Sequence, residues 1–238
     1  MKAHQRLIRE DRARSNPRPV VPLEGCYVEQ IDRATASTII LEYEWLRSVP
    51  ANATAFYGLR SADGELIGAS VFGPTPGTNS QNVCGEENRE ITIGLVRGAC
   101  VHYVHQHAPS YFTAAAVRQA ARDHGWRVFV AYQDERAGEC GTIYQACNWV
   151  YIGAGTGRGG SNYRTLYVKP DGSTFSSRNM RRLYQRTGTS WDHYEALGWS
   201  KTREPDKGKY VWLEGSKTEK RRLRKKLRYP ALPYPKRD

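Results

Sequence analysis

The chain has 238 residues, enough for one well-buried domain with an appendage, and its 36 Lys and Arg against 24 Asp and Glu give a formal net charge of +12. No apolar run approaches the about 20 residues that a membrane-spanning helix needs, and the five cysteines form no CxxC pair and follow no signal peptide. These features exclude a membrane span and a disulfide scaffold, and they indicate a cytoplasmic protein with reduced thiols.

The positive charge is concentrated in the last quarter of the chain. Up to Phe175 the sequence holds 18 basic and 17 acidic residues, and the remainder holds 18 basic and 7 acidic ones. A nearly neutral body followed by a strongly basic segment indicates a polyanionic partner. We therefore expect a basic, proline-rich arm over residues 1–24, a body over residues 25–175 and a basic extension over residues 176–238.

The first half of the body alternates strands and helices. Apolar residues over 27–31 predict a strand, and the helical spacing of apolar residues over 34–49 predicts a helix. The segment 55–73 predicts a β-hairpin, because alternating apolar residues flank the turn-forming pair Asp63-Gly64. A polar, Gly- and Pro-rich loop is expected over residues 74–88.

The next elements deliver polar side chains to their ends. Alternating apolar residues over 90–96 predict a strand with Arg97 near its end, and Ser110 stands in a capping position for a helix over 111–123. A buried strand over 128–132 then ends beside Asp134.

A strand, helix, strand unit closes the body. Helical spacing over 143–149 follows that buried strand, strand character resumes up to Ile152, and one more strand is expected over 163–169. In such units the carboxyl ends of strands and the amino ends of helices face one crevice, so Asp134 and the turn from Gly141 to Tyr144 should line a site.

This order of elements is similar to that of GNAT-type acyltransferases, an α/β fold whose mixed central sheet is splayed between its fourth and fifth strands. The YQACNW stretch also resembles the Tyr-x-x-Gly-Phe ending of that family. GNAT enzymes bind the CoA pyrophosphate with a glycine-rich turn before their third helix, and the corresponding segment here, ACVHYVHQHAPS, lacks that turn. The resemblance implies acetyl-CoA or a related CoA thioester as donor, and the departure leaves an aminoacyl-tRNA open.

A narrower resemblance covers roughly residues 43–235. EYEWLRSVP, VRGA followed by APS, AYQDERAGECGTIYQACNW, SNYRTLYV and the ending RYPALPYP together resemble the Mom DNA-modification proteins of Mu-like phages. Those proteins convert adenine in DNA to its N6-carbamoylmethyl form and thereby protect phage DNA from host restriction. Matched motif by motif, the functional residues of that family fall on Arg97, Ser110, Asp134 and Tyr144.

Each of these four residues has a chemical and a structural interpretation. Asp134 suits hydrogen bonding to adenine N6 and removal of its proton, or it caps the next turn. Tyr144 matches the GNAT position whose hydroxyl protonates the leaving group, or it is a packed tyrosine. Arg97 suits binding of a phosphate or an acyl oxygen of the donor, or it forms a surface ion pair. Ser110 suits a helix cap that also contacts the donor, or it is a cap alone.

Two other patterns are weaker. His102, His105 and His107 have HxxHxH spacing, but a strand would point the first two to opposite faces and no further ligand lies at a recognised spacing, so no metal is predicted. The Gly-rich stretch 153–160 lacks the GK[ST] ending of a phosphate loop and precedes a strand, which predicts a turn with backbone contact to nucleic acid.

The basic extension contains two expected helices. The first, over 177–188, carries Arg178, Arg181 and Arg182, and the stretch KTEKRRLRKKLRY surrounds Leu223 and Leu227 with cations. The nucleic-acid-binding residues predicted in that stretch are Arg221, Arg222, Arg224, Lys225 and Lys226. Trp191, Trp199, Tyr210 and Trp212 offer stacking surfaces between them.

The sequence thus predicts a transferase acting on adenine N6 in double-stranded DNA, with tRNA as a further partner if it supplies the donor. Two alternatives stay open: an N-acyltransferase acting on a protein or small molecule, and a non-catalytic DNA-binding module on a degenerate acyltransferase fold.

Overall fold

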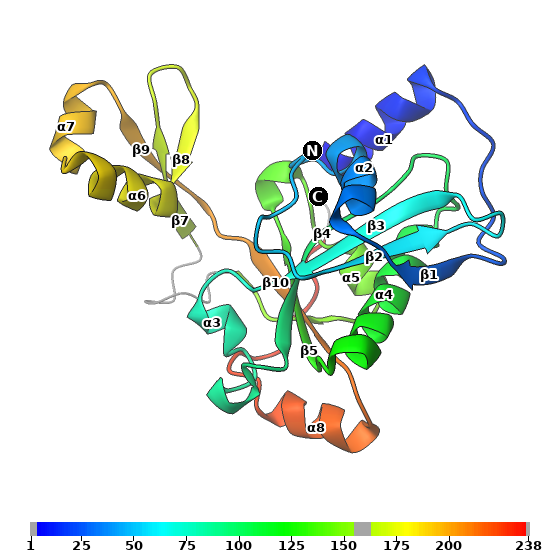
Figure 1. Ribbon diagram of the computed structural model, residues 1–238. Coiled ribbons are helices and arrows are strands. Elements are labelled where there is room, and N and C mark those ends of the chain that lie inside the picture. The colour runs from blue at the N-terminus through cyan, green and yellow to red at the C-terminus, as the bar shows by residue number, and fades with distance from the viewer. Residues whose placement is uncertain (1–3, 155–162, 237–238) are drawn as a thin grey trace. The chain divides into compact units, whose positions relative to one another are not determined.

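The computed structural model describes residues 4–154 and 163–236 (Figure 1). Compactness divides the chain into two units, which we call unit 1 (Met1–Gly153 with Gly208–Asp238) and unit 2 (Ala154–Lys207). The expected boundary between residues 175 and 176 does not coincide with this division. Part of the expected extension belongs to unit 1, because a strand at 208–213 lies inside its sheet.

A seven-stranded sheet forms the centre of unit 1, in the order β1-β2-β3-β4-β5-β10-β6. The strands are β1 (Tyr27–Gln30), β2 (Ala55–Arg60), β3 (Leu66–Gly73), β4 (Thr92–Cys100), β5 (Val128–Gln133), β10 (Gly208–Leu213) and β6 (Val150–Tyr151). All neighbours are antiparallel except β4 and β5, which are parallel. The predicted hairpin is present as β2 and β3, and Gly64 adopts the positive φ of 83° that its turn requires.

The sheet is splayed where the sequence resemblance places the opening. β4 and β5 pair only from Thr92 to Gly94 on β4, and β4 then continues to Cys100 along β3 alone. A register shift between Val71 and Phe72 places a bulge in β4 on this stretch, just before Arg97. This mixed, splayed sheet with the expected order of helices is a GNAT-like α/β fold.

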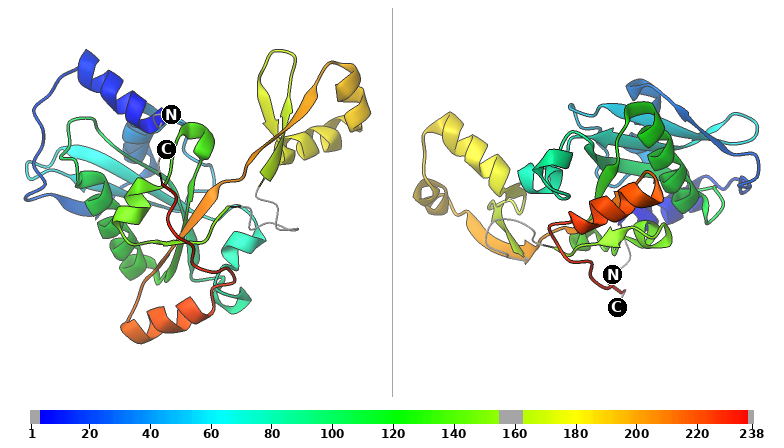
Figure 2. Two further views of the ribbon diagram at one scale, coloured as in Figure 1. Left: turned by 180° about the vertical axis from the view of Figure 1, so that it is seen from behind. Right: turned by 90° about the horizontal axis from the view of Figure 1, so that it is seen from below.

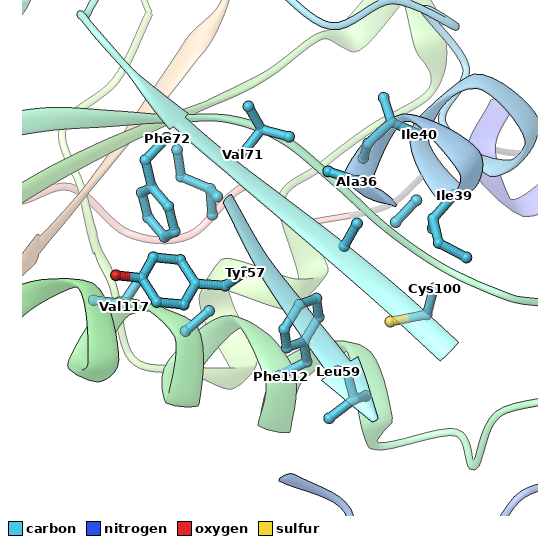
Figure 3. Close-up of a cluster of buried hydrophobic side chains, with 14 of the residues drawn as sticks. Ala36, Ile39, Ile40, Tyr57, Leu59, Val71, Phe72, Cys100, Phe112 and Val117 are labelled. Atoms are coloured by element: carbon cyan, nitrogen blue, oxygen red, sulfur yellow. The ribbon is translucent and has the colours of Figure 1, made fainter. Parts of the chain in front are cut away.

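Two helices cover opposite faces of the sheet (Figure 3). α2 (Arg33–Tyr43) buries Ile39 and Ile40 on one face, and α4 (Ala108–His124) buries Phe112 and Val117 on the other. α4 ends at Gly125, whose positive φ of 72° forms the predicted cap. α2 ends six residues earlier than its apolar periodicity predicts, because Glu44 leaves the helical conformation and its side chain accepts the N–H of Leu46.

The remaining elements of unit 1 are helices. They are α1 (His4–Ser15), α3 (Thr78–Gln81), the 3-10 helix η1 (Glu86–Asn88), the 3-10 helix η2 (Glu135–Ala137), α5 (Thr142–Ala146) and α8 (Lys217–Lys225). The arm expected over residues 1–24 contains α1, which has no buried residue. The loop expected over 74–88 contains α3 and η1, and it buries Val83 and Cys84.

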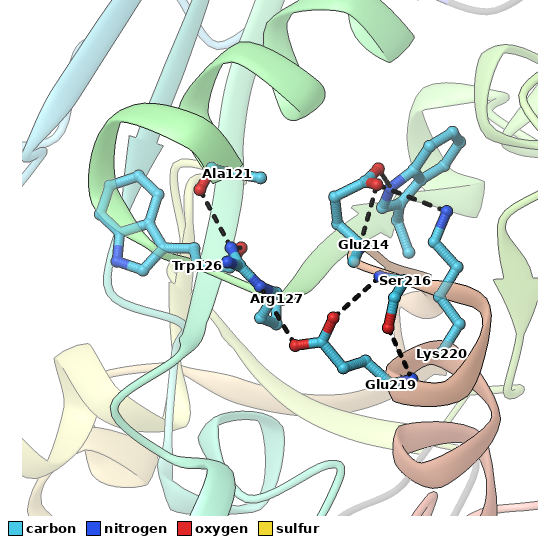
Figure 4. A network of polar contacts seen from close by, with 9 residues as sticks. Ala121, Trp126, Arg127, Glu214, Ser216, Glu219 and Lys220 are labelled. Atoms are coloured by element: carbon cyan, nitrogen blue, oxygen red, sulfur yellow. Dashed lines mark hydrogen bonds and ion pairs between the residues drawn. The ribbon is translucent and has the colours of Figure 1, made fainter.

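Helix α8 is part of the body of unit 1. Leu223 is fully buried in a cluster with Val128, Val130 and Val211 of strands β5 and β10. Ser216 and Glu219 form a reciprocal capping box, and Glu219 also lies 3.8 Å from Arg127 (Figure 4). The C-terminal segment then runs back from α8 along β6 (Figure 2).

Unit 2 has its own small sheet, in the order β8-β7-β9. Its strands are β7 (Tyr163–Val168), β8 (Thr174–Ser176) and β9 (Ser200–Pro205), and its helices are α6 (Ser177–Thr187) and α7 (Trp191–Ala196). The strand expected over 163–169 is therefore present but lies outside the central sheet, where β10 fills the place beside β5. Within the described residues, no helix is both long and apolar enough to cross a membrane.

Candidate functional site

Tyr144 lies on α5, the helix that follows β5 and η2 in the chain. Its ring packs against Trp149 and Tyr210, with 5.2 Å between ring centroids in each pair. Burial raises the pKa of Tyr144 well above its usual value, and the Glu139 and Glu44 carboxylates add to the shift. The hydroxyl therefore keeps its proton at neutral pH, and the ring packs as its structural interpretation predicts.

A glycine turn and the C-terminal segment fix the position of α5. Gly141 comes directly before α5 and has a positive φ of 73°. It lies so close to Tyr210 that a Cβ at this position would collide with the Tyr210 ring. The Gln145 amide donates to the carbonyls of Cys140 and Pro235, at 2.6 Å and 3.1 Å. Chain segments far apart in sequence thus set where Tyr144 stands.

Arg97 lies on β4 just after the bulge, facing the loop that follows α2. Its Nε donates to the Ser48 carbonyl at 2.8 Å, Nη2 donates to the Ser48 hydroxyl at 3.2 Å and Nη1 donates to the Val96 carbonyl at 2.6 Å. A guanidinium has five N–H groups, so one N–H at each terminal nitrogen remains beyond these three bonds. The side chain is 19% exposed, and this pair of N–H groups suits a phosphate or carboxylate oxygen pair.

Glu44 is the charged partner of Arg97, and the sequence did not predict a role for it. The residue is 5% exposed, and its Oε2 lies 3.7 Å from Arg97 Nε and 2.8 Å from the Leu46 backbone nitrogen, whose N–H it accepts. Burial raises the pKa of Glu44 to about 7 against the opposing effect of Arg97, and the Glu139 charge adds to the rise. Glu44 therefore exchanges its proton near neutral pH.

Asp134 lies at the carboxyl end of β5, as predicted, and is 6% exposed. Its Oδ1 accepts the Arg136 N–H at 3.2 Å and so caps η2, the structural interpretation of this residue. Its own backbone N–H donates to Glu139 Oε2 at 3.0 Å. Glu139 also adds to the rise that burial causes in the pKa values of Glu44 and Tyr144, and it is a second carboxylate that sequence reasoning missed.

Ser110 does not cap α4, contrary to the sequence prediction. The N-cap is His107, and the Ser110 hydroxyl donates back to the His107 carbonyl at 3.0 Å from inside the first turn. The turn lies beside α5, because the Cys147 thiol donates to the Ser110 carbonyl at 3.1 Å. The helix starts earlier than expected because Pro109 fits its first turn, where no backbone N–H is needed.

The segment before α4 does not fit the usual CoA pyrophosphate site. His107 N–H donates to His105 Nδ1 at 3.3 Å, Ala108 N–H donates to the His105 carbonyl at 2.9 Å, and Pro109 has no N–H. Three successive positions are therefore not available to bind a pyrophosphate through the backbone. The structure agrees here with the missing glycine-rich turn.

The three histidines of the HxxHxH pattern have separate partners. His102 Nε2 lies 2.7 Å from the Asn16 carbonyl oxygen and its Nδ1 lies 3.4 Å from the Tyr43 hydroxyl, whereas the rings of His105 and His107 lie 5.2 Å apart. In the part of the chain that the structure describes, no three His, Cys, Asp or Glu side chains gather in a way that could hold a metal ion. The turn predicted within 153–160 lies almost wholly outside the described residues.

The predicted nucleic-acid-binding residues lie on two helices. Arg178, Arg181 and Arg182 are exposed on α6 of unit 2. On α8 of unit 1, Lys226 pairs with Glu87 at 2.7 Å. The exposed cations of α8 and its C-terminal end are Arg221, Arg222, Arg224, Lys225 and Lys226. Tyr210, expected to offer a stacking surface, is instead fully buried in the core beside Tyr144.

Comparison with solved structures finds similar chains among acetyltransferases. A GNAT family acetyltransferase from Elizabethkingia anophelis with acetyl-CoA bound has 10% identity and a TM-score of 0.43, covering 80% of this chain and 99% of its own. An acetyltransferase from Bacillus subtilis in complex with CoA has 12% identity and a TM-score of 0.43 over 80% and 99%. A dodecameric spermidine N-acetyltransferase from Vibrio cholerae has 8% identity and a TM-score of 0.43 over 79% and 94%.

At the level of sequence, a search of curated proteins finds no match. A family profile does match, and it is that of the Mom protein family, over residues 25–236. The matched region includes every predicted site residue, all of unit 2, unit 1 without its first 24 and last two residues, and the strand β10 that the element-by-element prediction missed. Since this match extends over nearly the whole sequence, the chain belongs to the Mom protein family.

Proposed function

We propose that the protein is a phage DNA-modification transferase that converts adenine in DNA to N6-carbamoylmethyladenine and so protects phage DNA from host restriction in the host cytoplasm. The observation that carries this proposal is the polar group at the open end of the β4–β5 splay, in a chain of the Mom family. There the buried carboxylate of Glu44 lies 3.7 Å from Arg97 Nε, and its charge adds to the rise that burial causes in the pKa of Tyr144.

Adenine N6 is a weak nucleophile because its lone pair is delocalised into the ring. The enzyme must therefore hold the amino group, accept its proton and present an activated donor. In the proposed transfer step, N6 attacks the carbonyl carbon of the donor, so that the N6–carbon bond forms while the bond from that carbon to the leaving sulfur or oxygen breaks. A transferred glycyl group (–CO–CH2–NH2) contains the atoms of the carbamoylmethyl group (–CH2–CO–NH2), and it reaches that product when N6 and the amino group exchange places on the two carbons. Asp134 orients N6 and takes its proton, and Tyr144 gives its hydroxyl proton to the leaving group.

Arg97 and Glu44 support this step without taking part in the bond changes. The two remaining N–H groups of Arg97 bind an oxygen pair of the donor, and Ser48 and Glu44 hold the guanidinium in place. The negative charge of Glu44 also favours the protonated form of Tyr144 before the reaction. Ser110 lies beside α5 through its carbonyl and is a donor contact at the start of α4.

The donor follows from the fold only in part. An acetyl-CoA or related CoA thioester is the donor of the GNAT-type enzymes that this chain resembles, but the backbone before α4 does not fit the usual pyrophosphate site. An aminoacyl-tRNA needs no such site and suits the basic surface of the chain. The proposed step therefore does not depend on CoA.

The target adenine has to leave the double helix. Its N6 is hydrogen-bonded in the duplex and does not contact both Asp134 and a donor there. We therefore expect base flipping, at a cost of a few kcal/mol, similar to the cost in other base-flipping enzymes. A 2-aminopurine at the target site should brighten when the protein binds. Unchanged fluorescence at a site that is demonstrably modified contradicts this extrusion.

Nucleoside mass spectrometry of DNA from cells that express the protein tests the proposed function. A mass-shifted deoxyadenosine is expected from the wild type. An N-acyltransferase acting on protein or small molecules, or a non-catalytic DNA-binding module, leaves deoxyadenosine unchanged. Asp134→Asn should keep the fold and lose modification by about a hundredfold or more if the carboxylate is the base, and Tyr144→Phe tests the hydroxyl alone. Near wild-type modification by either folded variant returns that residue to its capping or packing role.

A further inference from the structure

Helix α6 of unit 2 presents a stripe of arginines. Its cations are Arg178, Arg181, Arg182 and Arg186, and all four side chains are exposed. Positions three, four and eight residues apart lie on one side of an α-helix, so these guanidinium groups share a face. The opposite side of the helix holds Met180, which is fully buried. The arginines thus form an exposed face of α6, and Met180 packs the other side of the helix into unit 2.

This stripe has no neutralising partner within the described residues. The helix sequence SRNMRRLYQRT contains no Asp or Glu, and no ion pair joins Arg178, Arg181 or Arg182 to a carboxylate in that part of the chain. Helix α8 differs, because it carries Glu219 in its first turn, Lys220 pairs with Glu214 at 3.3 Å and Lys226 pairs with Glu87. Lys220 of α8 and Lys226 at its C-terminal end are thus internal partners of unit 1, whereas Arg178, Arg181 and Arg182 pair with no carboxylate in the described residues.

Unit 2 holds α6 rigidly enough to position these side chains. The Ser176 hydroxyl accepts the Asn179 N–H at 3.2 Å as an N-cap, and the Ser177 hydroxyl donates to the Thr165 carbonyl of β7 at 3.2 Å. The Tyr184 ring of α6 packs on Tyr194 with 5.9 Å between centroids. A helix fixed at its start and along one face keeps its exposed arginines in a constant register.

An additional cation lies on the same small unit. Lys201 of β9 stands over the Trp191 ring at 4.1 Å and pairs across the sheet with Tyr167. This cation–π contact orders the Lys201 side chain without neutralising its charge. Unit 2 therefore has ordered positive groups beyond α6.

The dimensions of the stripe suit a nucleic-acid backbone. From Arg178 to Arg186 the helix rises by about 12 Å. A DNA strand carries a phosphate every 3.4 Å along the helix axis, so about three to four phosphates lie within that length. Arginine forks bind phosphate oxygens in pairs, which favours arginine over lysine for this contact.

We propose that unit 2 is the part of the protein that grips duplex DNA, with the arginine stripe of α6 lying along the phosphates of one strand, while unit 1 carries the transfer chemistry. This inference rests on the proposed function for its choice of duplex DNA as partner. The contact is electrostatic and positions the duplex without reading its sequence.

The first experiment compares two full-length variants that each lose three positive charges. One replaces Arg178, Arg181 and Arg182 by Gln, and the control replaces Arg221, Arg222 and Arg224 of α8 by Gln. Each lost phosphate contact should reduce the magnitude of the slope of log affinity against log salt by about 0.9. The magnitude of the slope should therefore fall by about 2.7 in the α6 variant and by much less in the α8 variant. Equal losses in both variants, or an unchanged slope in the α6 variant, overturn the inference.

The second experiment removes unit 2 from the chain. The chain leaves unit 1 after Gly153 and returns at Gly208, and strand pairing holds these two points together. Ile152 N–H donates to the Lys209 carbonyl and Lys209 N–H donates to the Gly153 carbonyl, both at 3.0 Å. Among the described residues, the two hydrophobic clusters of unit 1 contain none from 154 or 163–207. An Asn-Gly pair in place of residues 154–207 should join β6 to β10 as a two-residue hairpin.

The excised chain should unfold cooperatively on heating and should have lost most of its affinity for duplex DNA. A folded excised chain with wild-type DNA affinity overturns the inference, as does an α6 variant that loses affinity for RNA and keeps that for duplex DNA. The proposed function is tested separately by the modified nucleoside in wild-type cells. A steep loss of DNA affinity in the α6 variant without any modified deoxyadenosine in the wild type rejects that function and leaves the gripping role in place.

Discussion

Replacing Glu44 by Gln should make the protein more stable at pH 8 and leave its stability at pH 4.5 nearly unchanged. Burial raises the pKa of Glu44 from 4.5 to about 7, so the folded state favours the protonated carboxyl over the carboxylate. A group with a raised folded-state pKa contributes its stability below the unfolded pKa and loses it as the pH rises through the folded pKa. The relevant window therefore runs from about pH 4.5 to somewhat above pH 7.

The size of the effect follows from the shift. At 1.36 kcal/mol per pKa unit, ionising Glu44 in the folded protein costs about 3 kcal/mol relative to the unfolded chain. The amide of Gln resembles the protonated carboxyl and does not ionise. The free energy of unfolding of the variant minus that of the wild type should accordingly rise from near zero at pH 4.5 to about 3 kcal/mol at pH 8.

Urea unfolding at half-unit pH intervals measures this difference, provided that the m-values of the two proteins agree. Glu42→Gln controls for the loss of a carboxylate in the same helix, since Glu42 lies two residues earlier with a 44% exposed side chain that pairs with Arg12 at 3.6 Å. A difference between Glu44→Gln and wild type that stays constant from pH 4.5 to pH 8 refutes the reasoning, because the carboxylate would then not be held in a site that disfavours its charge.

Three further predictions concern packing and geometry. Leu223→Ala should lower the free energy of unfolding of unit 1 by about 2–5 kcal/mol in urea titrations, because the side chain is fully buried; a loss below 0.5 kcal/mol contradicts the placement of α8. Gly141→Ala should destabilise by at least about 1–2 kcal/mol through its positive φ, and should also lower modification by moving Tyr144; unchanged thermal stability rejects this. Arg97→Lys keeps the charge but not the fork, so modification measured by nucleoside mass spectrometry should fall while the melting temperature changes little; full activity argues against oxygen-pair binding.

Much of the fold was predictable because short sequence patterns determine it. The alternation around Asp63-Gly64 gave the hairpin, and Gly125 gave the end of α4 through a conformation that glycine adopts without strain. β10 was missed for a physical reason. Its apolar run is only a few residues long and lies among Lys207, Lys209 and other charges, and its pairing with β5 joins residues about 80 positions apart, which no local pattern contains.

The candidate site was predictable only where a residue stands at the end of a recognisable element. Arg97, Asp134 and Tyr144 were chosen from the resemblance to the Mom family together with their places in or beside expected elements, and their roles stay predictions. Glu44 belongs to no periodic pattern, and its importance comes from Arg97, which lies 53 positions later and contacts it only after folding. The role of Ser110 as a cap was wrong because the sequence does not reveal that His107 and Pro109 begin the helix earlier.

The position of β10 in the central sheet also bears on how the protein is made. A ribosome that has released residues up to 207 has already produced β5 and β6, but the strand that lies between them, β10, has not yet been synthesised. Until it arrives, the apolar strand VFVAYQ has one unpaired edge, and such edges promote association between chains. The late strand therefore delays completion of the sheet until most of the chain has been translated, and we expect fragments ending before Gly208 to be substrates for chaperones and proteases and to have no partial activity.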